Sequence, residues 1–349
     1  MQEARKTPDW FTKGVMYQIQ VRAFTEEGTL KAAERKLPYL KDLGVTIAYL
    51  VPVMKMDAST DRTYWSPRQV KCGFAKNQYR ISDYFHVDEE FGTDQDLKDF
   101  CAAAHRLGMK VLFDLVYLHC GPTAPFLKEH PDFTWWNEDG TVKKGPYRFP
   151  KLNFANPGLR KYFDGNVRYL LTEYGADGFR CDVGDVPMLF TGNELADADE
   201  RQSMFCGTPM DWSQLEREPG RSRHAFVKRL AELRRTHPAL TALNGESGLT
   251  WLDTTDPERV TAFVRRGKGE TLLVVQNWSK EDVSSDVSFT VQKGSRPSYL
   301  AADDADHDVR GRISDERILS RLAEKTGERS FRLGPWGFII APILAVREK

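Results

Sequence analysis

The nonapeptide DGFRCDVGD, residues 177–185, is the stretch that decides the fold. It follows a helical pattern that ends at Gly175, and this succession is typical of a helix–strand unit in a parallel sheet. Arg180 and Asp182 are two residues apart, so they share one face of the predicted strand. Ligands meet the C-terminal ends of parallel strands, and an arginine keeps a neighbouring carboxylate ionised. Such a carboxylate suits nucleophilic attack on an anomeric carbon, although an ion pair that only orders the sheet explains the spacing equally well.

Similar strand–helix units precede this segment along the chain. Apolar, β-rich runs lie at residues 15–21, 45–53 and 110–117. Helical patterns lie at 30–43, after a Thr93–Asp96 pair with capping-box spacing, and after Asn156-Pro157. Four such units with nearly continuous apolar strands predict an α/β fold with a parallel sheet, either doubly wound or closed into a barrel.

The pattern changes after Gly184. Residues 186–190 fit one more strand, and an amphipathic helix is predicted near 223–237. Beyond about residue 244 the runs are strand-like and separated by turn signals; they lie at 271–278, 287–291 and 338–346. We therefore predict a barrel-type domain at 1–243 with a short loop insertion at 119–155, and an antiparallel β-sandwich domain at 244–349.

Composition excludes several classes of protein. Hydrophobic residues make up 40% of the 349 residues, which is enough for a core and excludes general disorder. Lys and Arg number 50 and so do Asp and Glu, and this zero net charge predicts neither a nucleic-acid nor a membrane partner. No apolar run approaches the length that spans a bilayer.

The first residues and the cysteines bear on location. Residues 1–13 are charged and carry no apolar signal segment, so we expect a cytoplasmic protein, with a processed secreted form as the alternative. The five cysteines, at 72, 101, 120, 181 and 206, are odd in number and lack metal-site spacing. We expect them to be free thiols in a reducing compartment.

Six segments in the same order resemble the α-amylase family of glycoside hydrolases, family 13. They are GVMYQIQVRAF (14–24), LKDLGVTIAYLVPV (40–53), NQYRISDYFHVDEEFGT (77–93), KVLFDLVYLHCGP (110–122), DGFRCDVGD (177–185) and PMLFTGNELAD (187–197). The resemblance implies a (β/α)8 catalytic barrel followed by a C-terminal β domain. The last of the six segments is similar to the family's eighth strand and the loop after it.

The resemblance also implies roles for single residues. Asp182 matches the catalytic nucleophile, and Arg180 the arginine beside it. His119 matches the histidine that binds the sugar at subsite −1, Tyr79 the aromatic that stacks on that sugar, and Asp114 the third strand's largely structural aspartate, which we include with the substrate-binding candidates. Trp65, Trp135 and Trp136 would serve either as sugar platforms or in local packing.

The sequence departs from the family in its middle. Only one residue, Val186, separates GFRCDVGD from the segment similar to strand eight, so strands five to seven have no counterpart. The acid/base Glu and the transition-state Asp of the family lie there. Gly14 to Leu243 is 230 residues, whereas a (β/α)8 barrel uses about 250. We therefore predict a barrel truncated to about five strand–helix units, with an open sheet edge through which the chain could self-associate.

Three functions stay open on this basis. The chain is an α-glucan or maltooligosaccharide hydrolase whose Asp182 acts by a retaining double displacement, impaired by the two missing carboxylates. Alternatively it is a non-catalytic relative that binds glucan, or an internally deleted, inactive product. Whether it is an enzyme is therefore undecided at this point. No cofactor is implied, and Leu118 replaces an Asn that binds calcium in the family, so no metal site is expected.

Overall fold

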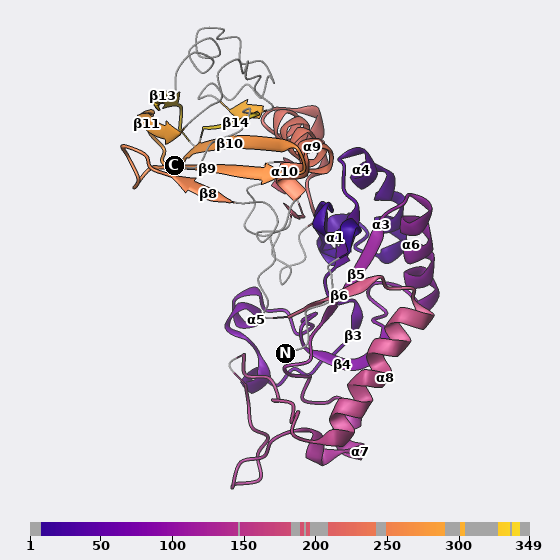
Figure 1. Ribbon diagram of the computed structural model, residues 1–349. Coiled ribbons are helices and arrows are strands. Elements are labelled where there is room, and N and C mark those ends of the chain that lie inside the picture. The colour runs from indigo at the N-terminus through magenta and orange to yellow at the C-terminus, as the bar shows by residue number, and fades with distance from the viewer. Residues whose placement is uncertain are drawn as a thin grey trace. The chain divides into compact units, whose positions relative to one another are not determined.

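The computed structural model describes residues 8–145, 147–182, 189–191, 193–195, 209–241, 249–289, 301–303, 327–335 and 337–342. Two compact units divide the chain (Figure 1). One unit is Met16–Gly220, and the other joins Met1–Val15 to Arg221–Lys349. Cys206 lies outside the described residues, and so do Asp185, Asp197, Asp199 and Glu246, the acidic residues that could be considered as substitutes for the missing general acid.

The Met16–Gly220 unit is built on a parallel sheet of five described strands in the order β6-β5-β2-β1-β7. Their bounds are Met16–Ile19 for β1, Ile47–Leu50 for β2, Lys110–Leu115 for β5, Gly178–Cys181 for β6 and Leu189–Phe190 for β7. Strands β1 and β2 are buried along their whole length, which explains why they are apolar except at Gln18 of β1. All five strands coincide with the predicted runs.

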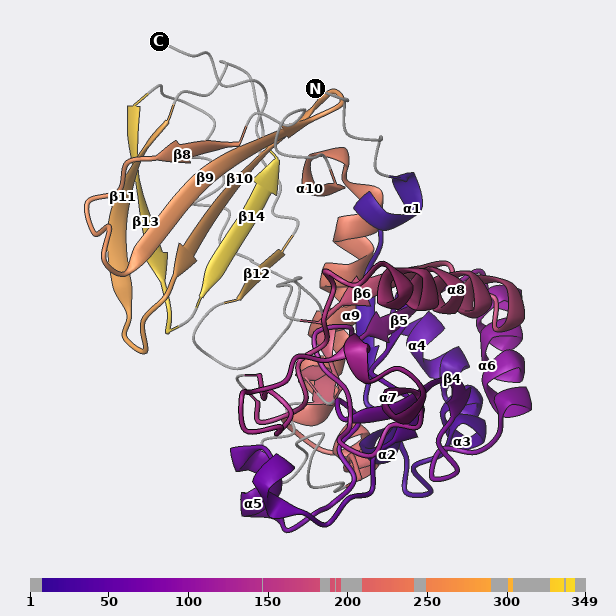
Figure 2. The same ribbon diagram turned by 90° about the horizontal axis from the view of Figure 1, so that it is seen from below.

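The helices of this unit begin at local sequence signals. Their bounds are Val21–Phe24 for α2, Leu30–Arg35 for α3, Leu37–Asp42 for α4, Asp94–Arg106 for α6 and Pro157–Glu173 for α8. Thr93 and Asp96 form the reciprocal capping box of α6, and the Asn156 side chain caps α8. The single helix predicted at 30–43 is two helices, because Pro38 lacks the N–H that would continue the first one. In both views α3, α6 and α8 lie along one side of the strands (Figure 2).

Two long excursions leave the sheet at its C-terminal end. The first contains an antiparallel pair, β3 at Met54–Met56 and β4 at Ile81–Val87, with the 3₁₀ turn η1 at Arg62–Tyr64 and the helix α5 at Pro67–Cys72 between them. The second, within the predicted insertion at 119–155, contains α7 at Phe126–Glu129, η2 at Pro131–Phe133 and isolated β-bridges such as His119–Lys151. The turns η3 at Asn193–Leu195 and η5 at Trp212–Glu216 follow β7.

The other unit holds two antiparallel sheets. One has the order β12-β14-β10-β9-β8 and the second pairs β11 with β13. The bounds are Thr250–Leu252 for β8, Val260–Gly267 for β9, Glu270–Asn277 for β10, Val283–Phe289 for β11, Ala301–Asp303 for β12, Gly327–Leu333 for β13 and Phe338–Pro342 for β14. The described part contains the predicted strands, and it adds β8, β9, β12 and β13.

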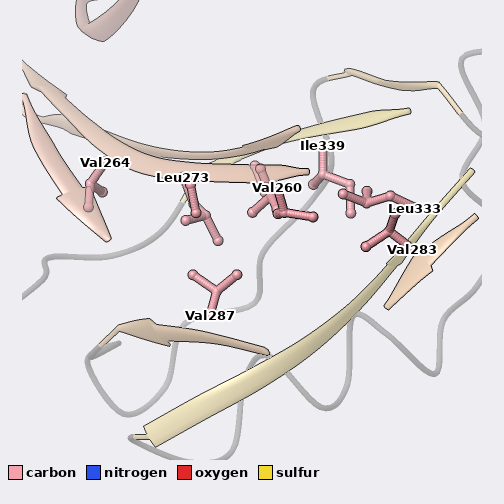
Figure 3. Packing of buried hydrophobic residues seen from close by; sticks show 10 residues of the cluster. Val260, Val264, Leu273, Val283, Val287, Leu333 and Ile339 are labelled. Carbon is pink, nitrogen blue, oxygen red and sulfur yellow. The ribbon is translucent and has the colours of Figure 1, made fainter. Parts of the chain in front are cut away.

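A hydrophobic core fills the space between these two sheets. Leu273 and Val264 point from the larger sheet toward Val287 and Val283 of the smaller one (Figure 3). A second cluster covers the opposite face of the larger sheet, where Leu233 of α9 (Gly220–Thr236) and Ala239 of α10 (Pro238–Thr241) pack on Leu272. The short helix α1, Asp9–Thr12, belongs to this unit through the carbonyl of Thr12, which accepts a hydrogen bond from Arg234.

The cysteines differ from the prediction at one described position. Cys101 and Cys120 are buried free thiols and Cys181 is an exposed one, whereas Cys72 is disulfide-bonded. The expectation of five free thiols is therefore wrong at Cys72, because spacing along the sequence does not reveal which cysteines meet in space. No helix among the described residues has the length and apolar composition needed to cross a bilayer.

Candidate active site

The ends of strands β5 and β6 bring two carboxylates onto one arginine. Asp114 of β5 lies in register with Arg180 of β6, and Asp182 follows two residues later on the same face. Nη1 of Arg180 lies 3.0 Å from each carboxylate oxygen of Asp114 and 2.8 Å from Oδ1 of Asp182. The predicted pairing of Arg180 with Asp182 is therefore present, and Asp114 joins it.

Asp114 is buried beneath the cavity and does not line it. Its side chain is fully buried and accepts hydrogen bonds from the hydroxyls of Tyr49 and Tyr79, the latter at 3.0 Å. Burial raises the pKa of Asp114 to about 6, against the opposing effects of the Tyr49 hydroxyl and the Arg180 guanidinium. Both oxygens of Asp114 are committed to neighbouring side chains, so its function here is to position Arg180 and Tyr79.

His119 is held in its neutral form beside Tyr79. Burial lowers the pKa of His119, and its Nε2 lies 2.8 Å from the backbone carbonyl oxygen of Tyr79. Because a carbonyl can only accept, Nε2 carries the proton and donates it, which leaves Nδ1 as an acceptor. The hydroxyl of Tyr84 fixes the backbone at this point by donating to the carbonyl oxygen of His119 at 2.9 Å.

A cavity of 590 Å³ opens beside these groups. Its walls include four of the predicted site residues, Asp182, Arg180, Tyr79 and His119. They also include residues that sequence reasoning missed: Ser66, Arg68, Asn77, Tyr147 and Phe149. Ser66 carries a local signal, its capping-box spacing to Gln69, and Asn77 begins the segment at 77–93. Arg68, Tyr147 and Phe149 lie outside the motifs singled out in the sequence.

Two of the predicted substrate contacts do not line this cavity. Asp114 lies beneath it, as described above. Trp65 is buried, and its indole Nε1 donates to the carbonyl oxygen of Ser59 at 3.1 Å. Of the two alternatives, this geometry favours local packing over a sugar platform. Trp135 and Trp136 are exposed, and they also lie outside the residues that line the cavity.

A buried arginine orders the loop that supplies one wall of the cavity. Arg80 is fully buried and donates to the carbonyl oxygens of Tyr64, Asp57, Ser59 and Ala75, all of them in the excursion between β3 and β4. Charge-assisted bonds to four carbonyls satisfy backbone groups that a loop would otherwise leave to water.

The helix α5 in the same loop begins with a capping box. The Ser66 side chain accepts from the Gln69 backbone, and the Gln69 side chain accepts from Ser66 in return. Gln69 also accepts from Asn77 at 3.1 Å. This chain of bonds places Ser66, Asn77 and Tyr79 along one wall of the cavity.

Glu194, in the segment similar to the loop after the family's eighth strand, is not among the residues that line the cavity. Glu194 is fully buried, and its Oε1 accepts from the hydroxyls of Tyr17 at 2.8 Å and Tyr39 at 3.2 Å. Buried in this way, it orders the segment after β7. Among the described residues, no group of three or more His, Cys, Asp or Glu side chains could hold a metal ion.

The described part of the Met16–Gly220 unit is an α/β structure whose parallel sheet carries an arginine-bound carboxylate at the C-terminal ends of its strands. Solved structures of the same fold include the noncanonic maltogenic α-amylase AmyB of Thermotoga neapolitana, with a TM-score of 0.66 at 17% identity over 96% of this chain and 99% of that one. They also include the α-amylase of Geobacillus thermoleovorans complexed with acarbose, with a TM-score of 0.69 at 16% identity over 97% and 99%. These likenesses establish the fold.

Sequence comparison finds a similarity that agrees with the motifs. Residues 7–132 match the family model for the catalytic domain of α-amylase. This segment is therefore similar to the α-amylase family of glycoside hydrolases, the family that the motifs indicate.

Individual relatives match only part of their length. The malto-oligosyltrehalose trehalohydrolase of Deinococcus radiodurans is 34% identical over 170 residues, which are 48% of this chain and 25% of that protein. The α-glucosidase of Pediococcus pentosaceus is 30% identical over 217 residues, which are 51% of this chain and 36% of that protein. The chain therefore spans about a quarter to a third of the length of these curated relatives.

Proposed function

We propose that the chain is an α-glucan or maltooligosaccharide glycosidase whose retaining reaction uses Asp182 as the nucleophile. One observation carries this proposal: Arg180 binds Oδ1 of Asp182 at 2.8 Å, and both side chains line the 590 Å³ cavity. Oδ2 of Asp182 accepts no hydrogen bond from the described residues, so one oxygen is available for attack. The names of the relatives, which act on malto-oligosyltrehalose or α-glucosides, support this substrate class.

Each cavity residue has a defined role in this proposal. Arg180 orients Asp182 through the 2.8 Å hydrogen bond that it donates to Oδ1. Nδ1 of neutral His119 accepts a hydrogen bond from a sugar hydroxyl. Tyr79 offers its ring to the sugar, while its hydroxyl is held by Asp114.

The proposal includes reduced catalysis. A retaining glycosidase needs a second carboxyl about 5–5.5 Å from the nucleophile to protonate the leaving group. Of the described carboxyl groups, Asp114 is the one that shares Arg180 with Asp182, and it is buried away from the cavity. We further propose that the barrel is truncated to about five strand–helix units and is followed by a β-sandwich.

A non-catalytic glucan-binding protein is the second candidate function. The observation that favours it is the same absence of a cavity-lining carboxyl besides Asp182 among the described residues. In that case the cavity would bind a maltooligosaccharide without turnover. An internally deleted product, the third possibility, would aggregate or self-associate through its open sheet edge.

Fluoride release from α-glucosyl fluoride tests the proposal. Fluoride departs with little help from a general acid, so the assay reports on the nucleophile and its sugar site. The proteins to compare are the unmodified chain, Asp182→Asn, and the matched control Asp164→Asn, which changes an exposed aspartate of α8.

Release that disappears in Asp182→Asn and persists in Asp164→Asn is the expected result. Hydrolysis of maltooligosaccharides would then show that a general acid exists. A soluble, cooperatively folded sample that releases no fluoride refutes the glycosidase proposal. Calorimetry with maltoheptaose would then decide between the binding protein and the inactive product.

A further inference from the structure

A second, basic hollow adjoins the cavity of the candidate active site. It has a volume of 280 Å³ and is lined by Lys143, Lys144 and Lys151. Its remaining wall includes His119, Tyr147 and Phe149, which also line the first cavity. The two spaces are therefore neighbours. The proposed glycosidase reaction gives the three lysines no role.

The backbone forces two of these lysines together. The N–H of Lys151 donates to the carbonyl oxygen of Lys143 at 3.0 Å, and the N–H of Lys143 donates to Trp135 at 2.7 Å. Lys151 also forms an antiparallel bridge with His119, which ties the arrangement to the end of β5. Like charges held on opposed extended segments repel each other, so this arrangement costs stability unless an anion lies between them.

No carboxylate among the described residues lines the hollow. Lys143 and Lys151 form no ion pair with the described residues. Lys144 is partly committed, since its Nζ donates to the carbonyl oxygen of Thr63 at 3.0 Å and lies 3.9 Å from the centre of the Tyr64 ring. Hydrogen bonds from Thr63, and to a lesser extent the charge of Lys144, lower the pKa of the nearby Asp61. Of the three lysines, Lys144 is the one that interacts with this carboxylate.

We propose that this hollow binds the phosphoryl group of a phosphorylated sugar whose ring occupies the adjoining cavity. A phosphate dianion supplies the negative charge that would compensate the ammonium groups of Lys143 and Lys151. Ammonium groups bind phosphate as point charges. His119, Tyr147 and Phe149 line both spaces, so the two lie within the reach of one phosphorylated sugar. The assignment of the sugar to the first cavity rests on the proposed function, and it narrows the substrate to phosphorylated α-glucosides.

Isothermal titration calorimetry of the whole chain tests this proposal. The probes are glucose 6-phosphate, inorganic phosphate and glucose, at one ionic strength and at a pH where phosphate is a dianion. The variant is Lys143→Gln/Lys151→Gln. The matched control is Lys31→Gln/Lys161→Gln, which removes the same charge from exposed positions on α3 and α8.

We expect glucose 6-phosphate to bind at least tenfold more tightly than glucose, and at least tenfold more weakly to the Lys143/Lys151 variant than to the control. Equal affinity in the variant and the control overturns the proposal. Inorganic phosphate that binds as tightly as glucose 6-phosphate, in a lysine-dependent way, overturns the sugar-borne source and indicates a site for free phosphate.

The failure of this proposal is distinguishable from failure of the glycosidase proposal. Lysine-dependent binding of glucose 6-phosphate without fluoride release would refute the glycosidase proposal and leave the phosphoryl site standing. Fluoride release without lysine-dependent binding would refute the phosphoryl site and leave the glycosidase proposal standing. Equal urea unfolding midpoints of the two double variants would establish that both are folded.

Discussion

Replacing Arg180 by Gln tests the claim that one guanidinium binds both carboxylates and compensates the charge of the buried Asp114. Arg180→Gln leaves Asp114 with its tyrosine hydroxyls and without its cation. Asp114 is fully buried, and the Arg180 and Asp182 side chains are only 18% and 16% exposed. Removing one partner of such a buried pair costs about 3 to 5 kcal/mol. We expect the lower end, since the cavity admits water.

The loss should depend on pH in a definite direction. The pKa of Asp114 is about 6 in the folded chain and about 3.9 when unfolded, so the folded state binds more protons between these values. Stability linked to this group is therefore full below about pH 4 and is lost as the pH rises to about 6. Without Arg180 the pKa of Asp114 rises further, so the variant continues to lose stability above pH 6.

Urea denaturation followed by circular dichroism at several pH values between about 5 and 8 measures this difference. Arg180→Gln should lie closer to the unmodified chain at pH 5.5 than at pH 8. Adding Asp114→Asn to the Arg180→Gln variant should remove the pH dependence and recover part of the stability. A deficit that stays constant across this range, or one below about 1 kcal/mol, would refute the claim that Arg180 neutralises a buried carboxylate.

Three further predictions concern other parts of the chain. Leu273→Ala, in the core between the two β sheets, should cost about 2 to 5 kcal/mol in thermal or urea unfolding, and a smaller loss would argue against that core. Thr93→Ala should cost about 1 kcal/mol through loss of the capping box of α6, while Thr93→Ser should retain most of it. Iodoacetamide should label the exposed Cys181 in the native chain and spare Cys101 and Cys120 until urea is added, because burial raises the pKa of both thiols; mass spectrometry of the labelled peptides would detect the reverse order.

Much of the barrel-type unit could be predicted from local sequence. The Thr93–Asp96 capping box and the Asn156-Pro157 helix start depend on neighbours within one turn, so a single sequence contains the whole signal. The same holds for Arg180 and Asp182, whose common face follows from strand geometry. Pro38 carried a local signal as well, and the break between α3 and α4 follows from it.

The walls of the two cavities could not be predicted in this way. Tyr147 and Phe149 line the cavity from a chain reversal whose following residue Lys151 bridges to His119. Arg80 orders its loop by binding carbonyl oxygens up to 23 residues away. Lys143 and Lys151 are unremarkable in sequence and become a pair only because the chain reverses between them. Side chains that meet through loops leave no periodic pattern for sequence reasoning to detect.

The position of β1 in its sheet has a consequence for synthesis of the chain. β1 lies between β2 and β7, and its Tyr17 pairs with Leu189, 172 residues later. At a translation rate of about 5–20 residues per second, β7 emerges from the ribosome about 10 to 30 s after β1, so one edge of β1 stays unpaired for that time. Throughout that interval an apolar strand presents unpaired amide and carbonyl groups. The nascent chain is therefore a natural client for a ribosome-associated chaperone.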